Sequence, residues 1–137
     1  MRLCLLRAPF QHPHARRLTP KVFGLTIQGV ERLKSRTAAA RCAVDGAAAL
    51  YGLGISEHLD ELDRVTCRLQ LHYGLRDQHV PRQEIDTVAA SVRGRPAVEV
   101  FLSPGAGHSF ANPVRPTYDP AAAKLAGERI EAMLRAM

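Results

Sequence analysis

Hydrophobic and polar positions follow two different periods along the chain, and these periods predict its elements. Residues 67–74 alternate strictly, with apolar side chains at the odd positions and polar ones at the first three even positions. This alternation is typical of a strand. Residues 21–28 and 96–102 are rich in β-branched and aromatic side chains, and they also predict strands. Residues 44–52 form a short apolar run between turn residues.

Three other segments have the character of helices. Residues 30–43 contain neither proline nor glycine. Residues 82–92 place apolar side chains three and four positions apart, and Gly94 ends this pattern. Asp119 followed by Pro120 predicts the N-terminus of a final helix. The expected buried face of this helix consists of Ala122, Ala126, Ile130, Met133, Leu134 and Met137.

The order of these elements predicts an α/β fold, because strands separated by helices form parallel sheets through right-handed crossovers. Ligands of such sheets bind where the strands end, at their carboxyl edge. The loops that follow Tyr51, Tyr73 and Leu102 are therefore the places to search for a site. Two of these loops contain the candidates Asp77 and His108. A carboxylate that accepts from one imidazole nitrogen leaves the other nitrogen available as a general base.

Charge is concentrated at the N-terminal end. Residues 1–41 contain nine basic side chains and one acid, and residues 42–137 contain ten basic and twelve acidic side chains. The formal net charge of +6 thus arises in the first third of the chain, which argues against nucleic acid as a partner of the main body. Residues 1–20 contain three prolines and predict an irregular basic arm, compatible with a transit peptide or with an unselected leader.

The 137 residues suffice for one globular domain. No apolar run approaches the ~20 residues that a membrane helix needs, so we expect no membrane contact and a cytoplasmic protein. Three cysteines without a Cys-x-x-Cys motif argue against a disulfide framework and against a structural zinc site. His12 and His14 are expected to lie in a solvated loop, and we predict no metal site.

The surroundings of Asp77 and His108 resemble the C-terminal half of the dienelactone hydrolases (carboxymethylenebutenolidases), an α/β-hydrolase family. The resemblance covers about residues 38–137. Its motifs are Gly-x-x-Asp-x-x-Val-Pro at 74–81, Pro-Gly-Ala-Gly-His-x-Phe at 104–110 and Tyr-Asp-Pro at 118–120. The resemblance implies that Asp77 is the acid and His108 the histidine of a nucleophile-His-Asp triad. It also implies hydrolysis of ester or lactone bonds by a cysteine nucleophile, without a metal or organic cofactor.

The expected architecture is therefore a partial α/β-hydrolase fold, with three to four mostly parallel strands and flanking helices. Residues 21–137 are expected to form the C-terminal portion of a dienelactone-hydrolase-like domain. Several strands that precede the nucleophile in the family are missing. This leaves one sheet edge unpaired unless residues 22–28 or the basic arm cover it. An unpaired edge recruits other chains, so we also expect self-association.

The nucleophile itself is not evident. The cysteine turn of the family would fall near Gly29, where neither cysteine nor serine stands. Cys42 and Cys67 are each expected roughly 20 Å from the reactive position, and Cys4 lies in the basic arm. The position of the family's substrate-binding arginine holds Asn112, so dienelactone itself is not predicted as the substrate.

Each candidate residue also has a purely structural interpretation. Asp77 is suited to capping its own turn, and His108 is compatible with an ordinary loop histidine. His72 and His79 are not expected to form a zinc-binding pair. Tyr51, at the end of a strand, is either a core residue or part of a cleft wall.

Three functions remain open from the sequence. The first is a family hydrolase that acts on a small-molecule ester or lactone, with its nucleophile supplied from elsewhere, such as a partner chain. The second is a truncated, catalytically inactive relative that serves as an interaction protein or is a remnant. The third, a nucleic-acid-binding module that uses the basic arm, rests on electrostatics alone.

Overall fold

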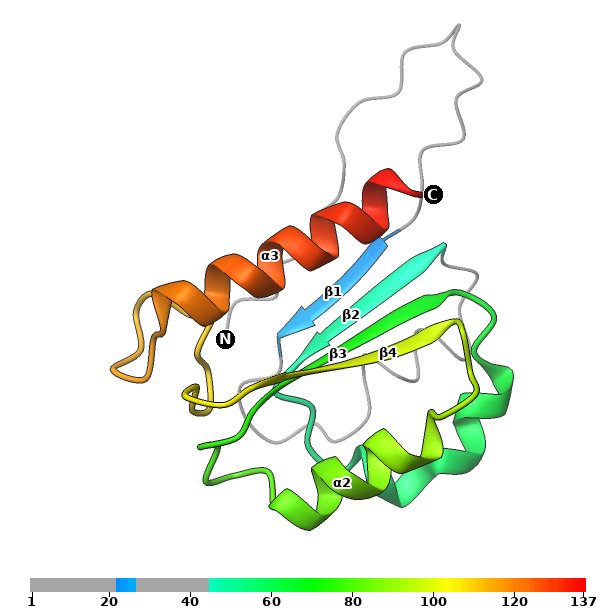
Figure 1. Cartoon of the computed structure of the whole chain (residues 1–137), viewed down its shortest axis with the longest axis horizontal. Helices are drawn as coiled ribbons and strands as arrows, with labels where there is room; N and C mark the ends of the chain where they lie inside the picture. Colours follow the sequence, from blue (N-terminus) through cyan, green and yellow to red (C-terminus); the bar gives the residue numbers. More distant parts are fainter. Residues whose placement is uncertain (1–21, 27–44) are drawn as a thin grey trace, which may run out of the picture.

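The computed structural model describes residues 45–137 and, by their backbone alone, residues 22–26 (Figure 1). In chain order, its elements are β1 (Val22–Thr26), β2 (Gly46–Leu50), the 3-10 helix η1 (Ile55–Arg64), β3 (Arg68–Gly74), α2 (Arg82–Ser91), β4 (Val98–Ser103) and α3 (Pro120–Arg135).

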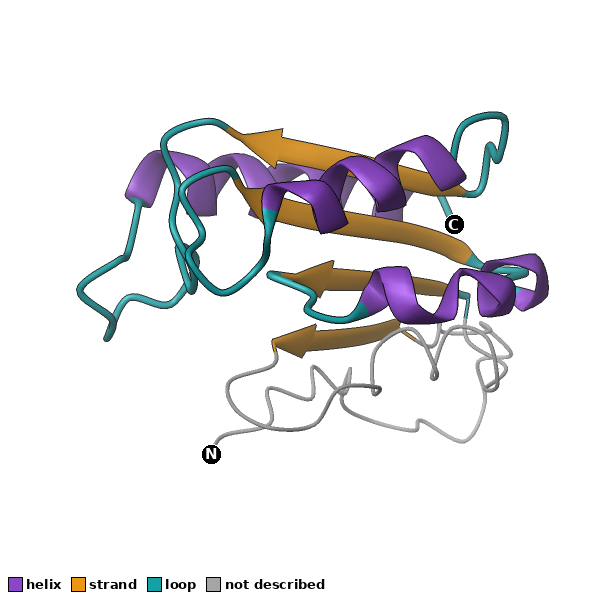
Figure 2. Ribbon diagram, turned by 90° about the horizontal axis from the view of Figure 1, so that it is seen from below, coloured by secondary structure: helices purple, strands orange, loops and turns teal. Residues whose placement is uncertain are grey.

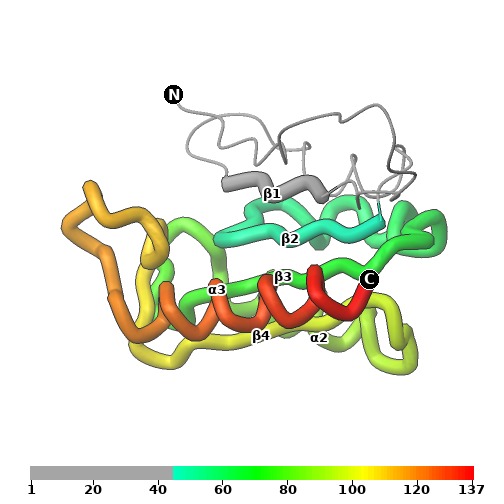
Figure 3. The backbone as a smooth tube through the Cα atoms, turned by 90° about the horizontal axis from the view of Figure 1, so that it is seen from above, coloured from blue at the N-terminus to red at the C-terminus, as the bar shows by residue number. Residues whose placement is uncertain are grey.

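The four strands form one sheet in the order β1-β2-β3-β4, and each neighbouring pair is parallel. Helix α3 covers one face of this sheet, and η1 and α2 cover the other (Figures 1, 2 and 3). Helices on both faces are what parallel strands require, because each connection must return the chain to the starting edge. The predicted α/β class with parallel strands is confirmed.

The register brings the carboxyl ends of the strands to one edge of the sheet. Thr26 is aligned with Leu50, and Leu50 is aligned with His72. Strand β3 continues two residues further, and its last residue, Gly74, is aligned with Ser103 at the end of β4. The loops that follow β3 and β4 therefore leave the sheet side by side.

The larger part of the core lies between the sheet and the η1–α2 layer. Strand β3 supplies its centre, with Leu69, Leu71 and Tyr73 each 1 % exposed. Helix α2 contributes Ile85 and Val88, as its apolar period predicted. Burial of large apolar side chains between the sheet and the helices that cover it is the main stabilising contribution to such a layered fold.

The second face of β3 is buried as well, which the strict alternation of residues 67–74 did not predict. Gln70 and His72 lie on this face, under α3, and are 3 % and 2 % exposed. The Gln70 amide donates to the Glu99 carboxylate at 3.2 Å and to the Arg129 carbonyl at 3.3 Å. His72 Nε2 lies 3.2 Å from the Gln70 side-chain oxygen. Buried polar groups that find partners in this way avoid most of the desolvation cost.

The connection between β2 and β3 contains an element that the sequence did not reveal. Residues 55–64 form η1, which is interrupted at His58 by a non-helical backbone (φ −143°). A broken 3-10 helix has no sustained period of 3.6 residues, so periodicity cannot detect it. The helix predicted at 30–43 and the arm predicted at 1–20 lie outside the residues that the structure describes.

Helix α3 begins as predicted and ends earlier than its apolar pattern suggested. The Asp119 side chain accepts hydrogen bonds from Ala121 N and Ala122 N, both at 3.0 Å, and Pro120 follows the cap. Of the six positions predicted to be buried, Ala122, Ala126 and Met133 are buried, whereas Ile130 and Leu134 are only half-buried. The prediction is wrong for Met137, which lies beyond the end of the helix and is 42 % exposed. Across the described ranges, 22–26 and 45–137, no helix is long and apolar enough to span a membrane.

Candidate active site

Two loops at the carboxyl edge of the sheet are joined by their backbones. Leu75 N donates to Ser103 O at 3.0 Å, and Arg76 N donates to Ala106 O at 2.9 Å. Gly74 permits this close approach, because a Cβ atom there would lie 2.3 Å from the Ala106 carbonyl oxygen. The loop after β3 and the loop after β4 thus form one structural unit.

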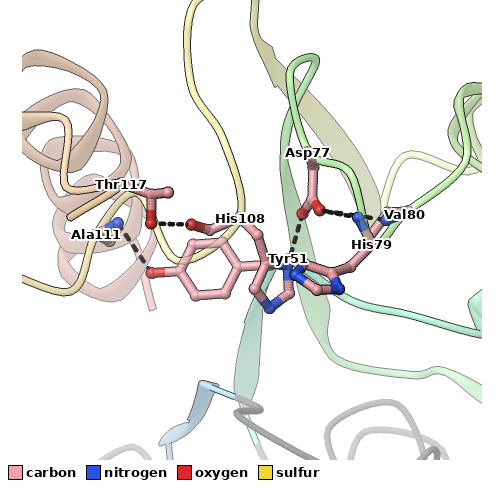
Figure 4. Close-up of polar contacts among 7 residues, drawn as sticks. All are labelled: Tyr51, Asp77, His79, Val80, His108, Ala111 and Thr117. Carbon is pink, nitrogen blue, oxygen red and sulfur yellow. Dashed lines mark hydrogen bonds and ion pairs between the residues drawn. The ribbon is translucent and has the colours of Figure 1, made fainter. Parts of the chain in front are cut away.

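This unit brings Asp77 and His108 together. His108 Nδ1 lies 2.8 Å from Asp77 Oδ2 (Figure 4). The Asp77 side chain is 1 % exposed, whereas that of His108 is 23 % exposed. A carboxylate only accepts, so the contact assigns the hydrogen to Nδ1 in the neutral imidazole and leaves a lone pair on Nε2. In Figure 4 the Nε2 end of the ring points away from Asp77.

The second oxygen of Asp77 holds the loop itself. Asp77 Oδ1 accepts from His79 N at 2.7 Å and from Val80 N at 3.2 Å. The structural interpretation of Asp77 as the cap of its own turn is therefore correct, and the same carboxylate also contacts His108. One oxygen fixes the orientation of the carboxylate, and the other meets the imidazole. Backbone hydrogen bonds to a buried carboxylate hold it in place far better than solvent does.

Aromatic rings flank the His108 imidazole. The Tyr51 ring centroid lies 5.4 Å from that of His108, and the His79 ring meets His108 edge to face with the centroids 4.6 Å apart (Figure 4). The backbone of His108 is held as well, because Thr117 Oγ1 donates to its carbonyl oxygen. The imidazole is thus contacted by the carboxylate and one ring from the loop after β3, and by a second ring from the end of β2.

Tyr51 is a core residue, 1 % exposed, and it also forms one wall beside His108. Its hydroxyl accepts from Ala111 N at 3.0 Å, and its ring packs edge to face on Phe110. Burial raises the pKa of Tyr51 to about 12, and the hydrogen bond from Ala111 opposes this increase to a lesser degree. The phenol is therefore a neutral, fixed packing group in the physiological range.

Backbone strain is concentrated beside the candidate pair. Tyr51 (φ 56°) and Ser109 (φ 64°) both adopt the left-handed conformation that side chains disfavour. Tyr51 follows the end of β2, and Ser109 directly follows His108. Both residues are buried. Residues in such conformations cluster at functional sites, where the surrounding packing keeps them in place.

Other predicted positions lie away from this pair. Cys67 immediately precedes β3, so it lies at the amino edge of the sheet, opposite the loops of Asp77 and His108. Burial raises the pKa of the Cys67 thiol, which disfavours the reactive thiolate. Gly29, Cys4 and Cys42 lie outside the described residues.

Asn112 has a local role in the loop that follows His108. Its side-chain oxygen accepts from Val114 N at 3.2 Å, and its backbone N donates to Ser109 O at 2.9 Å. His72 and His79 lie apart, since His72 stacks on Phe101 under α3 and His79 lies beside His108. Within ranges 22–26 and 45–137, no three side chains of the metal-binding types converge on one point.

The sequence did not predict the roles of two residues at this edge, His79 and Gly74. The ring contact of His79 with His108 is invisible in sequence, because it depends on how two loops are joined. The need for a small residue at position 74 was also missed, although the glycine is part of the motif that contains Asp77. A glycine at the end of a buried strand is the one signal that pointed to a close backbone approach.

Comparison with known proteins finds relatives of this chain in sequence and in fold. The model of the dienelactone hydrolase family matches residues 32–137. A protein of Azospirillum brasilense named "Putative carboxymethylenebutenolidase" is 34 % identical over 97 residues, which are 71 % of this chain and 42 % of that protein. The carboxymethylenebutenolidase of Pseudomonas putida is 33 % identical over 91 residues, 66 % of this chain and 39 % of its own length.

A solved structure shows the same fold. The "Putative Dienelactone Hydrolase" of Klebsiella pneumoniae superposes with a TM-score of 0.69 at 22 % identity, covering 75 % of this chain and 47 % of that one. The chain thus spans less than half the length of the relatives it matches. The fold is a partial α/β-hydrolase fold, and the chain belongs to the dienelactone hydrolase family.

Proposed function

We propose that this chain contributes the acid and the histidine of an active site that hydrolyses ester or lactone bonds of a small molecule. The observation that supports this most directly is the 2.8 Å contact between His108 Nδ1 and Asp77 Oδ2. The buried, backbone-bound carboxylate orients the imidazole, and the His108 side chain is partly exposed, as a general base that meets a reactant must be.

In this proposal, His108 Nε2 accepts the proton of the nucleophile as that group attacks the substrate carbonyl. Asp77 stabilises the imidazolium that forms, and His108 then returns the proton to the leaving alcohol oxygen. A water molecule later hydrolyses the acyl intermediate with the same histidine as its base. Asp77 and His108 are the proposed catalytic residues.

Among the residues that the structure describes, no cysteine lies beside His108. Cys67 lies at the opposite edge of the sheet. The carboxyl end of β1 at Thr26 lies at the same edge as Asp77, and the next residues lead to Gly29. Because position 29 holds no thiol or hydroxyl, we propose that a partner chain supplies the nucleophile, with no metal or organic cofactor.

A second candidate function is favoured by the residue at the position where the family places its nucleophile. The chain spans 42 % of its relative from Azospirillum brasilense and holds glycine where the family's nucleophile is expected. In this alternative the chain is a truncated, inactive relative that acts as an interaction protein or is a remnant. Self-association through an unpaired sheet edge fits both functions, and size-exclusion chromatography measures it.

We propose a cytoplasmic location and no nucleic-acid partner. The cytoplasmic location fits the single cysteine of the described segments, Cys67, which is buried and free. The absence of a nucleic-acid partner fits the slightly acidic composition of residues 42–137. Imaging of a fluorescent fusion and salt-dependent DNA-binding assays test these two points.

The test of the hydrolase proposal is turnover of a chromogenic short-chain ester by the purified chain. We expect His108→Ala to lower kcat by about 10²- to 10⁴-fold, the usual contribution of a general base. His58→Ala is the control, because His58 lies in η1, between β2 and β3. Turnover that is equal in the wild type and in His108→Ala contradicts the proposal.

A gain-of-function variant separates the two candidates. Gly29→Cys restores a thiol at the position where the family places its nucleophile. If the wild type shows no turnover and Gly29→Cys shows a burst of acylation that depends on His108, the chain is an inactive relative that retains the acid-histidine pair. A wild type that turns over and loses activity in His108→Ala supports the hydrolase with an external nucleophile.

A further inference from the structure

His79 contacts both members of the proposed catalytic pair. Its backbone N donates to Asp77 Oδ1 at 2.7 Å, and its ring meets the His108 ring edge to face, with the centroids 4.6 Å apart (Figure 4). The first contact is available to any residue except proline, because it uses the backbone alone. The second contact depends on the side chain and requires an aromatic ring.

The rings on the two sides of His108 differ in how they are held. Tyr51 is 1 % exposed and is fixed by Ala111 and Phe110. His79 is exposed, so core packing does not account for the place of its ring. The edge-to-face arrangement is the one that aromatic quadrupoles favour, and its strength corresponds to about a 3- to 10-fold preference between two conformations.

We propose that His79 is a positioning residue for His108. Its ring blocks rotation of the imidazole on the side that Tyr51 leaves open, and it thereby keeps Nδ1 on Asp77 Oδ2 with Nε2 directed away from the carboxylate. This inference rests on the proposed function, because the orientation matters for proton transfer. It assigns a role in the proposed site to a third side chain, beside those of Asp77 and His108.

Variants at position 79 test the role of the ring. His79→Ala and His79→Leu remove the aromatic edge, and His79→Phe retains it without the imidazole nitrogens. All three keep the backbone N–H that Asp77 accepts. Gln78→Ala is the matched control, since Gln78 is the exposed neighbour in the same loop. Superimposable circular dichroism spectra confirm that each variant is folded.

The first measurement needs no turnover. The hydrogen-bonded Nδ1 proton of His108 is followed by nitrogen-resolved NMR in every variant. We expect its resonance to persist in the wild type, Gln78→Ala and His79→Phe, and to broaden or disappear in His79→Ala and His79→Leu. An unchanged resonance in both ringless variants overturns the inference.

The second measurement is ester hydrolysis. We expect kcat to fall about 3- to 10-fold in His79→Ala with KM unchanged, and to recover in His79→Phe. A loss in His79→Phe equal to that in His79→Ala contradicts the inference, because a ring is then not what matters. If the wild type does not turn over, the hydrolase proposal fails, and the NMR result decides the role of His79 by itself.

Discussion

At the scale of single residues, the structure gives two histidines opposite environments. His108 lies at the edge of the sheet, is partly exposed and contacts the carboxylate of Asp77. His72 lies under α3, is 2 % exposed, and faces Gln70, Phe101 and the positive charge of Arg129. The first environment suits proton transfer, and the second suits a packing group that is neutral at physiological pH.

His72 makes the stability of the fold depend on pH. Burial, with a smaller contribution from Arg129, lowers the pKa of His72 from 6.5 to about 4. The imidazole of residue 72 therefore binds a proton more readily in the unfolded chain than in the folded one. The contribution of neutral His72 to the free energy of unfolding is complete above pH 6.5, and it is lost as the pH falls from 6.5 to about 4. Its total is about 2–4 kcal/mol.

Urea unfolding of the wild type and His72→Gln at pH 7.0 and 4.5 measures this effect. We expect the free energy of unfolding to decrease more in the wild type than in the variant, since carboxylates titrate equally in both. Equal decreases in the two proteins show that His72 does not carry the pH dependence.

At the scale of elements, the site depends on the junction between β3 and the loop after β4. The backbone bonds of Leu75 and Arg76 to that loop hold Asp77 and His108 at one distance. Parallel pairing of β3 with β4 continues directly into this junction, since Gly74 is aligned with Ser103. Regular sheet structure thus extends to within a few residues of the proposed catalytic pair.

Gly74→Ala tests this junction. A Cβ atom at position 74 would lie 2.3 Å from Ala106 O, so the loop must move away. We expect a drop in melting temperature of several degrees, for a cost of about 1–3 kcal/mol, and a fall in hydrolysis of at least about 10-fold. Gly105→Ala is the control. Gly105 lies in the loop after β4, next to Ala106, and a Cβ atom there would meet nothing within 4 Å. Equal behaviour of the two variants contradicts the role assigned to the junction.

At the scale of the whole molecule, the sequence alone predicted the features that depend on local patterns of residues. The strand at 67–74, the helix at 82–92 and the cap at Asp119 are confirmed, because periodicity and capping are local signals. It missed η1, whose backbone is irregular, and the burial of Gln70 and His72, which depends on α3 lying across the sheet. Loop contacts such as that of His79 with His108 are tertiary and leave no local pattern.

The central claim is that Asp77 orients His108 for proton transfer, and Asp77→Asn tests it most directly. An amide retains the shape and a turn-capping oxygen, but it does not stabilise the imidazolium. We expect kcat/KM for a short-chain ester to fall about 10²- to 10⁴-fold, with Asp86→Asn on the exposed face of α2 unchanged as the control. A wild type without turnover, or Asp77→Asn within about twofold of the wild type, contradicts the account.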